Sequence, residues 1–169
     1  MRKPKKLTAF LLALTLLFAC AACASGNSTT DSGKTISGTL PEIIDRLYDT
    51  VDVDDEQRGF LKNSVGTVEI PKDQSAYYFG VENLDFEEAV ASEPFINAIA
   101  FSVCLMRVKD GTDIDELKAE IRRSANPAKW ICVDVNPNDV RVESVGDLVL
   151  LIMADDSEKY SEAFYALAE

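Results

Sequence analysis

The stretch that most constrains the fold is the run from Ala100 to Val108, with the sequence AFSVCLMRV. Apolar side chains occupy both alternating sets of positions along this run. Because successive residues of a β-strand point to opposite faces of the sheet, the run predicts a central strand that is covered on both faces.

The segments around this run predict an α+β fold. Apolar residues at helical spacing and capping signals favour helices at 41–51, 54–65, 85–91, 112–125 and from Asp156 or Ser157 to the end. Short apolar or aromatic runs favour strands at 68–70, 76–81, 96–108, 131–133, 140–143 and 148–153.

The order of these segments from residue 96 onward is strand, helix, strand, strand, helix. The strands at 140–143 and 148–153 are joined by a tight turn at Gly146-Asp147, which is typical of a hairpin. We therefore expect a mainly antiparallel sheet with packed helices, in a single domain over residues 39–169.

The N-terminus has the organisation of an export signal. Residues 1–6 include four basic residues, and residues 7–19 are uncharged and apolar. The run is shorter than the ~20 apolar residues of a membrane-spanning helix and matches the apolar core of a secretory signal. We expect residues 1–19 to be a signal peptide and the rest of the chain to be exported.

The end of this apolar run indicates lipid attachment. The segment Leu17–Cys20, LFAC, resembles the lipobox of bacterial lipoproteins, in which the cysteine receives fatty acyl groups such as palmitate. Cys20 is the predicted attachment site and Cys23 is the alternative. A secretory signal cleaved near Ala22 and an uncleaved anchor are the other interpretations. Residues 20–38 are small and polar, which predicts a flexible linker.

The composition restricts the partners and the chemistry. The formal net charge is −12, and without the four basic residues at the N-terminus 13 basic and 29 acidic residues leave −16. Such a body is repelled by phosphate backbones, so we expect no nucleic-acid partner. The chain contains no histidine, which excludes Ser-His-Asp and Cys-His catalysis and zinc sites that need imidazole.

Two further cysteines, Cys104 and Cys132, lie in apolar, strand-like segments. An exported chain can form a disulfide, and adjacent strands can bring the two thiols together. The favoured interpretation, however, is that both are buried free thiols that pack as small apolar side chains. A catalytic thiol is not expected, because there is no histidine to activate it.

Two acidic stretches resemble calcium-binding loops only in part. Asp52, Asp54 and Glu56 alternate, as do the polar residues of 134–138, but both stretches lack the turn glycine and the closing glutamate. A solvated helix start and a polar turn are the favoured interpretations. We assign no metal site and no cofactor.

Aromatic and acidic residues leave two weaker hypotheses. Tyr77, Tyr78, Phe79 and Trp130 can form a stacking surface for a ligand, although packing in the core is favoured. Many carboxylate pairs could hydrolyse a sugar, but no pair is singled out by its spacing. No catalytic residue is assigned.

Four segments carry a resemblance to a known family. Ser92-Glu93-Pro94, the run IAFSVCLMRVKDG at 99–111, NPAKWICV at 126–133 and GDLVLLIM at 146–153 resemble a family of small, uncharacterised lipoproteins from Gram-positive, clostridia-like bacteria. The family contains a domain of unknown function, so the resemblance implies lipid anchoring and no activity.

These observations favour a membrane-anchored protein on the extracytoplasmic face that binds a small ligand or an envelope protein and is not an enzyme. The alternatives are an extracytoplasmic hydrolase that works on cell-wall material through carboxylates and an accessory subunit of a membrane complex. Membrane lipid, reached through the acylated cysteine, is the expected partner in each case.

Overall fold

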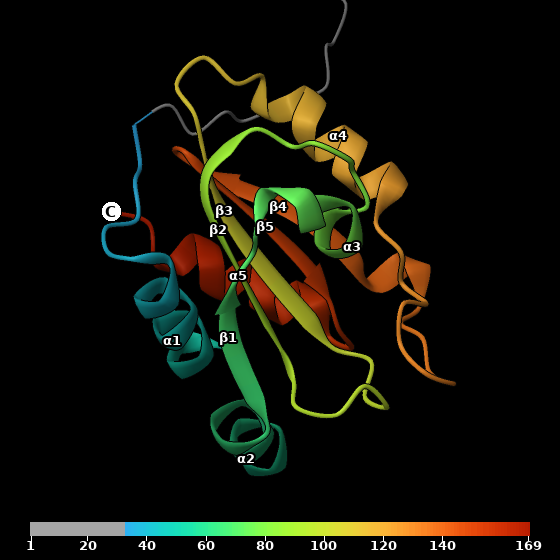
Figure 1. The fold of residues 1–169 in the computed structure, drawn as a ribbon. Helices are drawn as coiled ribbons and strands as arrows, with labels where there is room; N and C mark the ends of the chain where they lie inside the picture. The colour runs from blue at the N-terminus through green and yellow to red at the C-terminus, as the bar shows by residue number, and fades with distance from the viewer. Residues whose placement is uncertain (1–32) are drawn as a thin grey trace, which may run out of the picture. The chain divides into compact units, whose positions relative to one another are not determined.

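The computed structural model describes residues 33–169, so the predicted signal peptide, Cys20, Cys23 and most of the predicted linker lie outside the described residues. Five strands form one sheet: β1 (Val65–Glu69), β2 (Phe86–Pro94), β3 (Ser102–Val108), β4 (Val140–Val145) and β5 (Leu148–Met153). Their order is β1-β2-β3-β5-β4, and every neighbouring pair is antiparallel. The predicted α+β fold is therefore confirmed (Figure 1).

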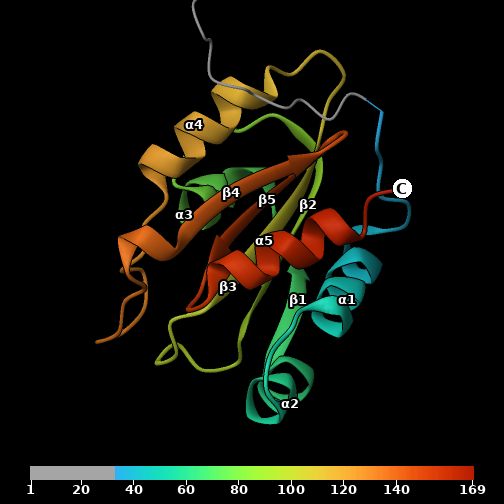
Figure 2. The same cartoon turned by 180° about the vertical axis from the view of Figure 1, so that it is seen from behind.

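Helices cover both faces of the sheet (Figures 1 and 2). They are α1 (Leu40–Thr50), α2 (Asp55–Asn63), α3 (Ser75–Phe79), α4 (Ile114–Ser124) and α5 (Ser157–Ala166), with short turns η1 (Lys72–Gln74) and η2 (Pro137–Asp139). One buried cluster joins α1 and α5 to the sheet, and a second joins α3 and α4 to its other face. As the sequence predicts, β3 lies between these layers, and all its residues except Arg107 are buried.

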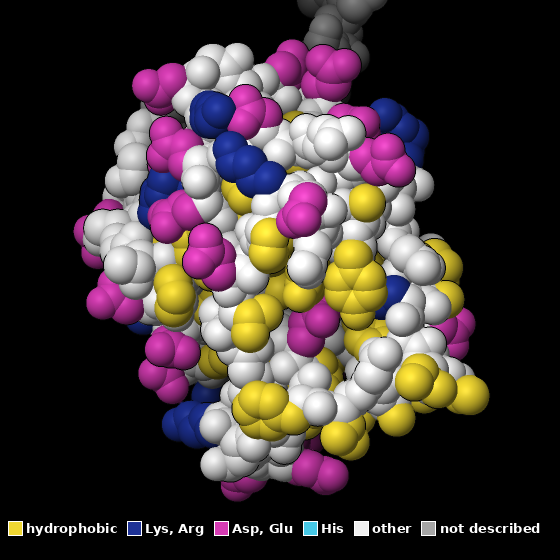
Figure 3. Space-filling model, viewed as in Figure 1, with side chains coloured by type: hydrophobic (Ala, Val, Ile, Leu, Met, Phe, Trp, Pro, Cys, Tyr) yellow, Lys and Arg dark blue, Asp and Glu magenta, His cyan; other side chains and the backbone are white. Residues whose placement is uncertain are grey.

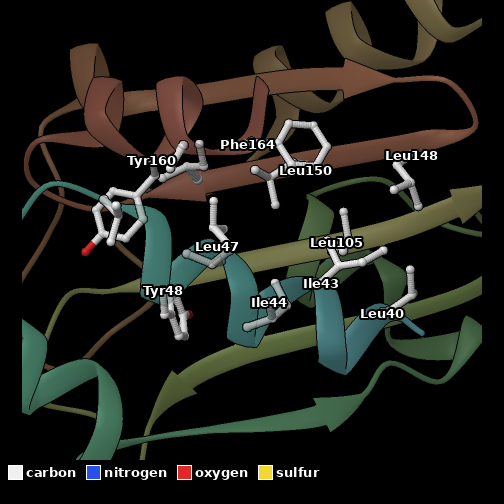
Figure 4. Close-up of a cluster of buried hydrophobic side chains, with 14 of the residues drawn as sticks. Leu40, Ile43, Ile44, Leu47, Tyr48, Leu105, Leu148, Leu150, Tyr160 and Phe164 are labelled. Atoms are coloured by element: carbon white, nitrogen blue, oxygen red, sulfur yellow. The ribbon is translucent and has the colours of Figure 1, made fainter. Parts of the chain in front are cut away.

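Helix α1 shows why this sequence packs as it does (Figure 4). Its N-terminus is closed by a capping box, in which the Thr39 backbone N–H donates to the Glu42 carboxylate at 2.9 Å. The helix then buries a stripe at helical spacing against Leu105 of β3 and Leu150 of β5. The residues of that stripe are Leu40, Ile43, Ile44, Leu47 and Tyr48.

The packed domain begins before the predicted boundary at residue 39. Ile36 is buried in the cluster around α1, and Thr35 exchanges two backbone hydrogen bonds with Glu169, at 3.3 and 3.1 Å. Ile36 is the one large apolar residue of the predicted linker, and it packs in the buried cluster that joins α1 and α5 to the sheet. The end of the predicted linker, residues 35–38, is therefore part of the domain.

The prediction of a strand at 76–81 is wrong, because this segment forms helix α3. Its aromatic residues favour a strand, but Ser75 and Phe79 are four residues apart and are both buried on one side of a helix. Gly80 ends the helix with φ +76°. A Cβ there would lie 2.0 Å from the carbonyl oxygen of Ser124, so only glycine permits this close approach to the end of α4.

The prediction of a short helix at 85–91 is also wrong, because this segment is part of strand β2. Glu87 and Glu88 are exposed and suggest a helix, but the register shifts between Phe86 and Glu88 and the ordinary alternation is lost there. The small residues that follow, Ala89 and Ala91, are buried under α3 and α4.

The strand predicted at 131–133 is a loop. Ile131 donates its backbone N–H to the carbonyl oxygen of Asn97 at 2.9 Å, which is a single loop-to-loop contact. Cys132 has φ +61°, in the left-handed region that a strand does not use. By contrast, the predicted hairpin of β4 and β5 is confirmed, with Gly146 in its turn.

Candidate functional site

An open cavity of about 400 Å³ lies beside the start of α5. It is lined by the N-terminal half of α2 and the residues just before it, by residues 99–101 ahead of β3, and by the β5–α5 connection with the first turn of α5. We call this space the acidic cavity. Its chemistry comes from an aromatic wall and a carboxylate rim.

The aromatic wall consists of Phe60, which is partly exposed, and of Phe101 and Tyr160, which are only 3% and 1% exposed and pack behind it. The Phe101 ring lies edge-on to both others, with centroids 5.4 Å from Phe60 and 5.9 Å from Tyr160. Gln57 donates from Nε2 to the Tyr160 hydroxyl at 3.1 Å, which places one polar group in the wall. Burial raises the pKa of Tyr160 above its ordinary value, so this hydroxyl stays neutral and can still donate a hydrogen bond.

The rim carries four exposed carboxylates: Asp54, Glu56, Asp155 and Asp156. One ammonium group accompanies them, since Lys159 Nζ lies 3.0 Å from Asp156 Oδ2. The hydrogen bond and the charge of Asp156 raise the pKa of Lys159, and the more distant charges of Asp52 and Asp54 act in the same direction. The potential at the mouth of the acidic cavity is therefore negative.

Local structure explains how these side chains come together. Asp54 caps α2 by accepting the backbone N–H of Gln57 at 2.8 Å, and Gln57 and Phe60, one turn apart, then both line the cavity. Asp156 has φ +55° at the start of α5 and reverses the chain after β5. This reversal places Lys159 and Tyr160 opposite α2.

A second group of polar side chains lies on the other face of the sheet. Lys129 Nζ lies 2.5 Å from Glu93 Oε1 and donates to Ser102 Oγ at 3.2 Å. Ser102 Oγ donates to Glu93 Oε1 at 2.7 Å and lies 3.4 Å from Cys104 Sγ. We call these four residues the lysine cluster. The side chains of Lys129 and Glu93 are only 3% and 19% exposed, so this ion pair is largely withdrawn from solvent.

Three aromatic rings surround the ammonium of the lysine cluster. Lys129 Nζ lies 4.8 Å from the ring centre of Tyr77, 5.3 Å from Tyr78 and 5.4 Å from Trp130. These distances are within the range of cation–π attraction. Of the predicted aromatic surface, Phe79 and Trp130 are buried in the core and Tyr78 packs against it, while Tyr77 is exposed. Tyr77, Tyr78 and Trp130 contact this lysine.

The lysine cluster offers no accessible nucleophile. Ser102 and Cys104 are both fully buried. Burial raises the pKa of the Cys104 thiol from 9 to about 11, which keeps it protonated and unreactive at neutral pH. A serine beside a lysine resembles a catalytic pair in composition, but a substrate cannot reach this one without unfolding of the surrounding layer.

The two cysteines of the domain are free thiols, Cys104 buried in β3 and Cys132 exposed in the loop after α4. The disulfide, which the sequence left as the less favoured possibility, is not formed in the structure. The favoured interpretation of two buried thiols holds for Cys104 only, because the segment of Cys132 is a loop at the surface.

The two calcium-like stretches have structural roles instead. Asp54 caps α2, and the Asn136 side chain accepts the backbone N–H of Asn138 at 2.9 Å at the start of η2. Within residues 33–169 there is no group of three acidic or cysteine side chains arranged to hold a metal ion.

An apolar patch lies on the face that carries α3. Phe95, Ile96 and Ile131 are 72%, 60% and 63% exposed, and the contact of Ile131 with Asn97 brings their two loops side by side. Figure 3 shows hydrophobic side chains gathered at the lower right of this view, where these loops lie in Figure 1. Monomeric proteins seldom expose such residues together without a function.

Sequence reasoning missed the acidic cavity almost entirely. It considered Asp54 and Glu56 as calcium ligands but had no reason to connect them with Asp155 and Asp156, about a hundred positions later in the chain. One local signal was present in the sequence. Asp155 and Asp156 are adjacent and lie directly before the predicted last helix, so they place two negative charges just after the end of β5.

The fold and the cavity define a small α+β domain with an open, acid-rimmed cavity and an aromatic wall. No family model, no curated protein and no solved structure matches the chain. Among the described residues, no helix has the length and apolar character needed to cross a membrane.

Proposed function

We propose that this protein is an extracytoplasmic bacterial lipoprotein, anchored through acyl chains on Cys20, whose domain binds a ligand in the acidic cavity. Basic residues in 1–6, the apolar run 7–19 and the lipobox-like segment ending at Cys20 support the anchoring. Two acyl chains, at ~0.8 kcal/mol for each buried CH₂, are enough to hold a small protein at a membrane.

The cavity itself is the observation that carries the binding function. Ligand sites in proteins are concave, roughly 300–1,000 Å³ in volume, and mostly apolar with a few polar groups that orient the ligand. The acidic cavity has a volume of about 400 Å³, a partly exposed aromatic ring at Phe60 and a partly exposed amide at Gln57. It therefore fits one small molecule.

Binding is favoured over catalysis by the exposure of the reactive groups. Hydrolysis by two carboxyl groups needs one of them to be held protonated, usually by burial. The four rim carboxylates are all exposed, while Ser102 and Cys104 are buried away from the cavity. The alternative of a carboxylate-dependent hydrolase therefore has less support than a binding protein.

A fragment screen by saturation-transfer NMR tests the binding function. The full chain in detergent micelles is mixed with neutral, anionic and cationic fragments, and hits are retested on the Ile99→Trp variant. Ile99 lines the cavity, so the larger side chain fills it and abolishes binding. Ile96→Trp, in the same loop but outside the lining, is the matched control. Hits that survive Ile99→Trp, or no hits at all, overturn the proposal.

The anchoring is tested by mass spectrometry of the mature N-terminus. Cys20→Ser is expected to abolish the mass of the acyl groups and to release the protein from the membrane or block its processing. Cys23→Ser is the control and should leave acylation intact. If the effects of the two variants are exchanged, Cys23 is the attachment site. If the wild-type chain carries no acyl group, the lipoprotein assignment fails.

A role as accessory subunit of a membrane complex is the second candidate, and the apolar patch of Phe95, Ile96 and Ile131 favours it. Native electrophoresis in mild detergent should then show the protein in a band larger than the monomer. The Ile96→Asp variant should return it to the monomer position, and an unchanged band would remove this candidate.

A further inference from the structure

We infer that the ligand of the acidic cavity is a small organic cation, an amine or quaternary ammonium group carried on an apolar body. This inference rests on the proposed binding function and adds the chemical class of the ligand. It follows from the charge left unpaired at the rim, from the aromatic wall behind it and from the size of the space between them.

The rim holds more negative charge than the domain neutralises. Lys159 pairs with Asp156 and is the one cation among the lining residues. Asp54 accepts a backbone N–H, and Glu56 and Asp155 have no Lys or Arg of residues 33–169 within ion-pair distance. A ligand with positive charge gains attraction from these carboxylates, whereas an anion is repelled.

The wall of the cavity selects an organic cation over a simple hydrated ion. Phe60, Ile99 and Ala100 are partly exposed and offer apolar area, and the aromatic ring of Phe60 attracts ammonium groups. A metal ion gains little from such a wall, and within residues 33–169 there is no set of side chains arranged to bind one. The apolar body of an organic cation contacts the wall while its charge stays near the rim.

The remaining features of the cavity agree with this ligand. Gln57 lines the cavity and is partly exposed, so its amide supplies a hydrogen-bonding group to a ligand. A volume of about 400 Å³ accommodates a molecule of moderate size rather than a polymer chain. The net charge of −12 also attracts cations towards the domain from a distance.

Three probes with one apolar body and different charges test the inference: phenylbutylammonium, phenylbutanol and phenylbutanoate. Each is titrated into the full chain in detergent micelles and followed by NMR or calorimetry. The ammonium probe should bind about tenfold more tightly than the alcohol, because each of two nearby rim carboxylates contributes roughly threefold in water. The carboxylate probe should bind more weakly than the alcohol.

Variants locate this preference at the rim. Glu56→Gln combined with Asp155→Asn should weaken binding of the ammonium probe about tenfold and leave the alcohol unchanged. Glu82→Gln combined with Asp115→Asn removes the same charges from exposed positions outside the cavity, and should change binding less than about twofold because such distant charges are screened. Lys159→Gln should strengthen binding of the ammonium probe, since it removes the competing cation.

The outcomes separate this inference from the proposed function. Equal binding of the ammonium and alcohol probes, blocked by Ile99→Trp, overturns the cation preference and leaves the binding function standing. The same is true if none of the three binds while other fragments do so in the cavity. If neither the probes nor any fragment binds there, both proposals fail.

Discussion

The acidic cavity and the lysine cluster both hold charged side chains against aromatic rings, and they differ in whether the charge is paired. In the lysine cluster one ammonium is matched by one carboxylate, a serine and three rings, and the ion pair is largely withdrawn from solvent. In the acidic cavity four carboxylates share one lysine and remain exposed. Paired and buried charge contributes to the folded structure, whereas exposed and unpaired charge is available to a ligand.

The acidic cavity and the lysine cluster contain residues that are adjacent in the sequence, because the side chains of an extended segment alternate between the two faces of the sheet. Phe101 forms part of the cavity wall, and Ser102, the next residue, belongs to the lysine cluster. Successive side chains along an extended chain point in opposite directions. We therefore expect substitutions in the lysine cluster to change the stability of the fold, and substitutions at the acidic cavity to change ligand binding.

The largest effect is expected from Lys129→Met. This change leaves the Glu93 carboxylate partly buried without its cation, and the loss of one partner from a buried ion pair costs about 3 kcal/mol. Urea denaturation measures the change in the free energy of unfolding. Lys62→Met is the matched control: its ion pair with Asp49 is exposed and 3.7 Å long, and it should cost less than about 1 kcal/mol. Equal costs would show that the lysine cluster is not a buried pair.

A smaller loss is expected in alkaline solution, and it also arises from the lysine cluster. Burial raises the pKa of Cys104 from 9 to about 11. A raised pKa in the folded state stabilises the protein below pH 9, and this stability is lost as the pH rises from 9 to about 11, because the unfolded chain ionises first. The loss should reach about 2.7 kcal/mol, since each of the two pKa units corresponds to 1.36 kcal/mol.

The Cys104→Ala variant separates this effect from that of the tyrosines. Burial also raises the pKa values of Tyr48, Tyr78, Tyr160 and Tyr165, whose unfolded forms ionise near pH 10. Between pH 9 and 10, the variant should therefore lose clearly less stability than the wild type. Parallel curves in this interval would contradict the assignment to Cys104.

The smallest effect on stability is expected at the acidic cavity. Neutralising Glu56 and Asp155 removes exposed, unpaired charges that repel one another, so the free energy of unfolding should stay within about 0.5 kcal/mol of the wild type or rise slightly. Thermal denaturation measures it beside the probe titrations. If the free energy of unfolding falls by more than about 1 kcal/mol, the rim carboxylates stabilise the fold. The acidic cavity would then resemble the lysine cluster in its contribution to stability.

Strong local patterns predicted much of the fold. The run at 100–108 is apolar at both alternating positions, and its residues 102–108 form a strand buried on both faces, although the predicted strand began at residue 96. The helix predicted at 112–125 is present as α4, capped by the Asp113 side chain, which accepts from the Glu116 N–H at 3.0 Å. Each of these patterns depends on residues within one turn or one strand, so the sequence alone was sufficient.

Where local preference and packing disagree, the sequence misled. Tyr77 and Tyr78 favour a strand, yet they lie in a helix because Phe79 must reach the core and Gly80 must approach the end of α4. Glu87 and Glu88 favour a helix, yet they lie in β2 because this segment pairs with β1 on one side and with β3 on the other. Tertiary contacts outweigh propensities of a few tenths of a kcal/mol for each residue.

The sequence by itself determined the α+β class, the doubly covered strand, the terminal helix and the lack of any histidine-based chemistry, and it predicts an export signal ending at Cys20. The tertiary structure alone decided that Lys129 meets Glu93 and that Asp54 and Asp155 share one rim. The physical reason is distance along the chain. Periodicity reports which way a side chain points within its own element, and only the packing of elements determines which distant side chain it meets.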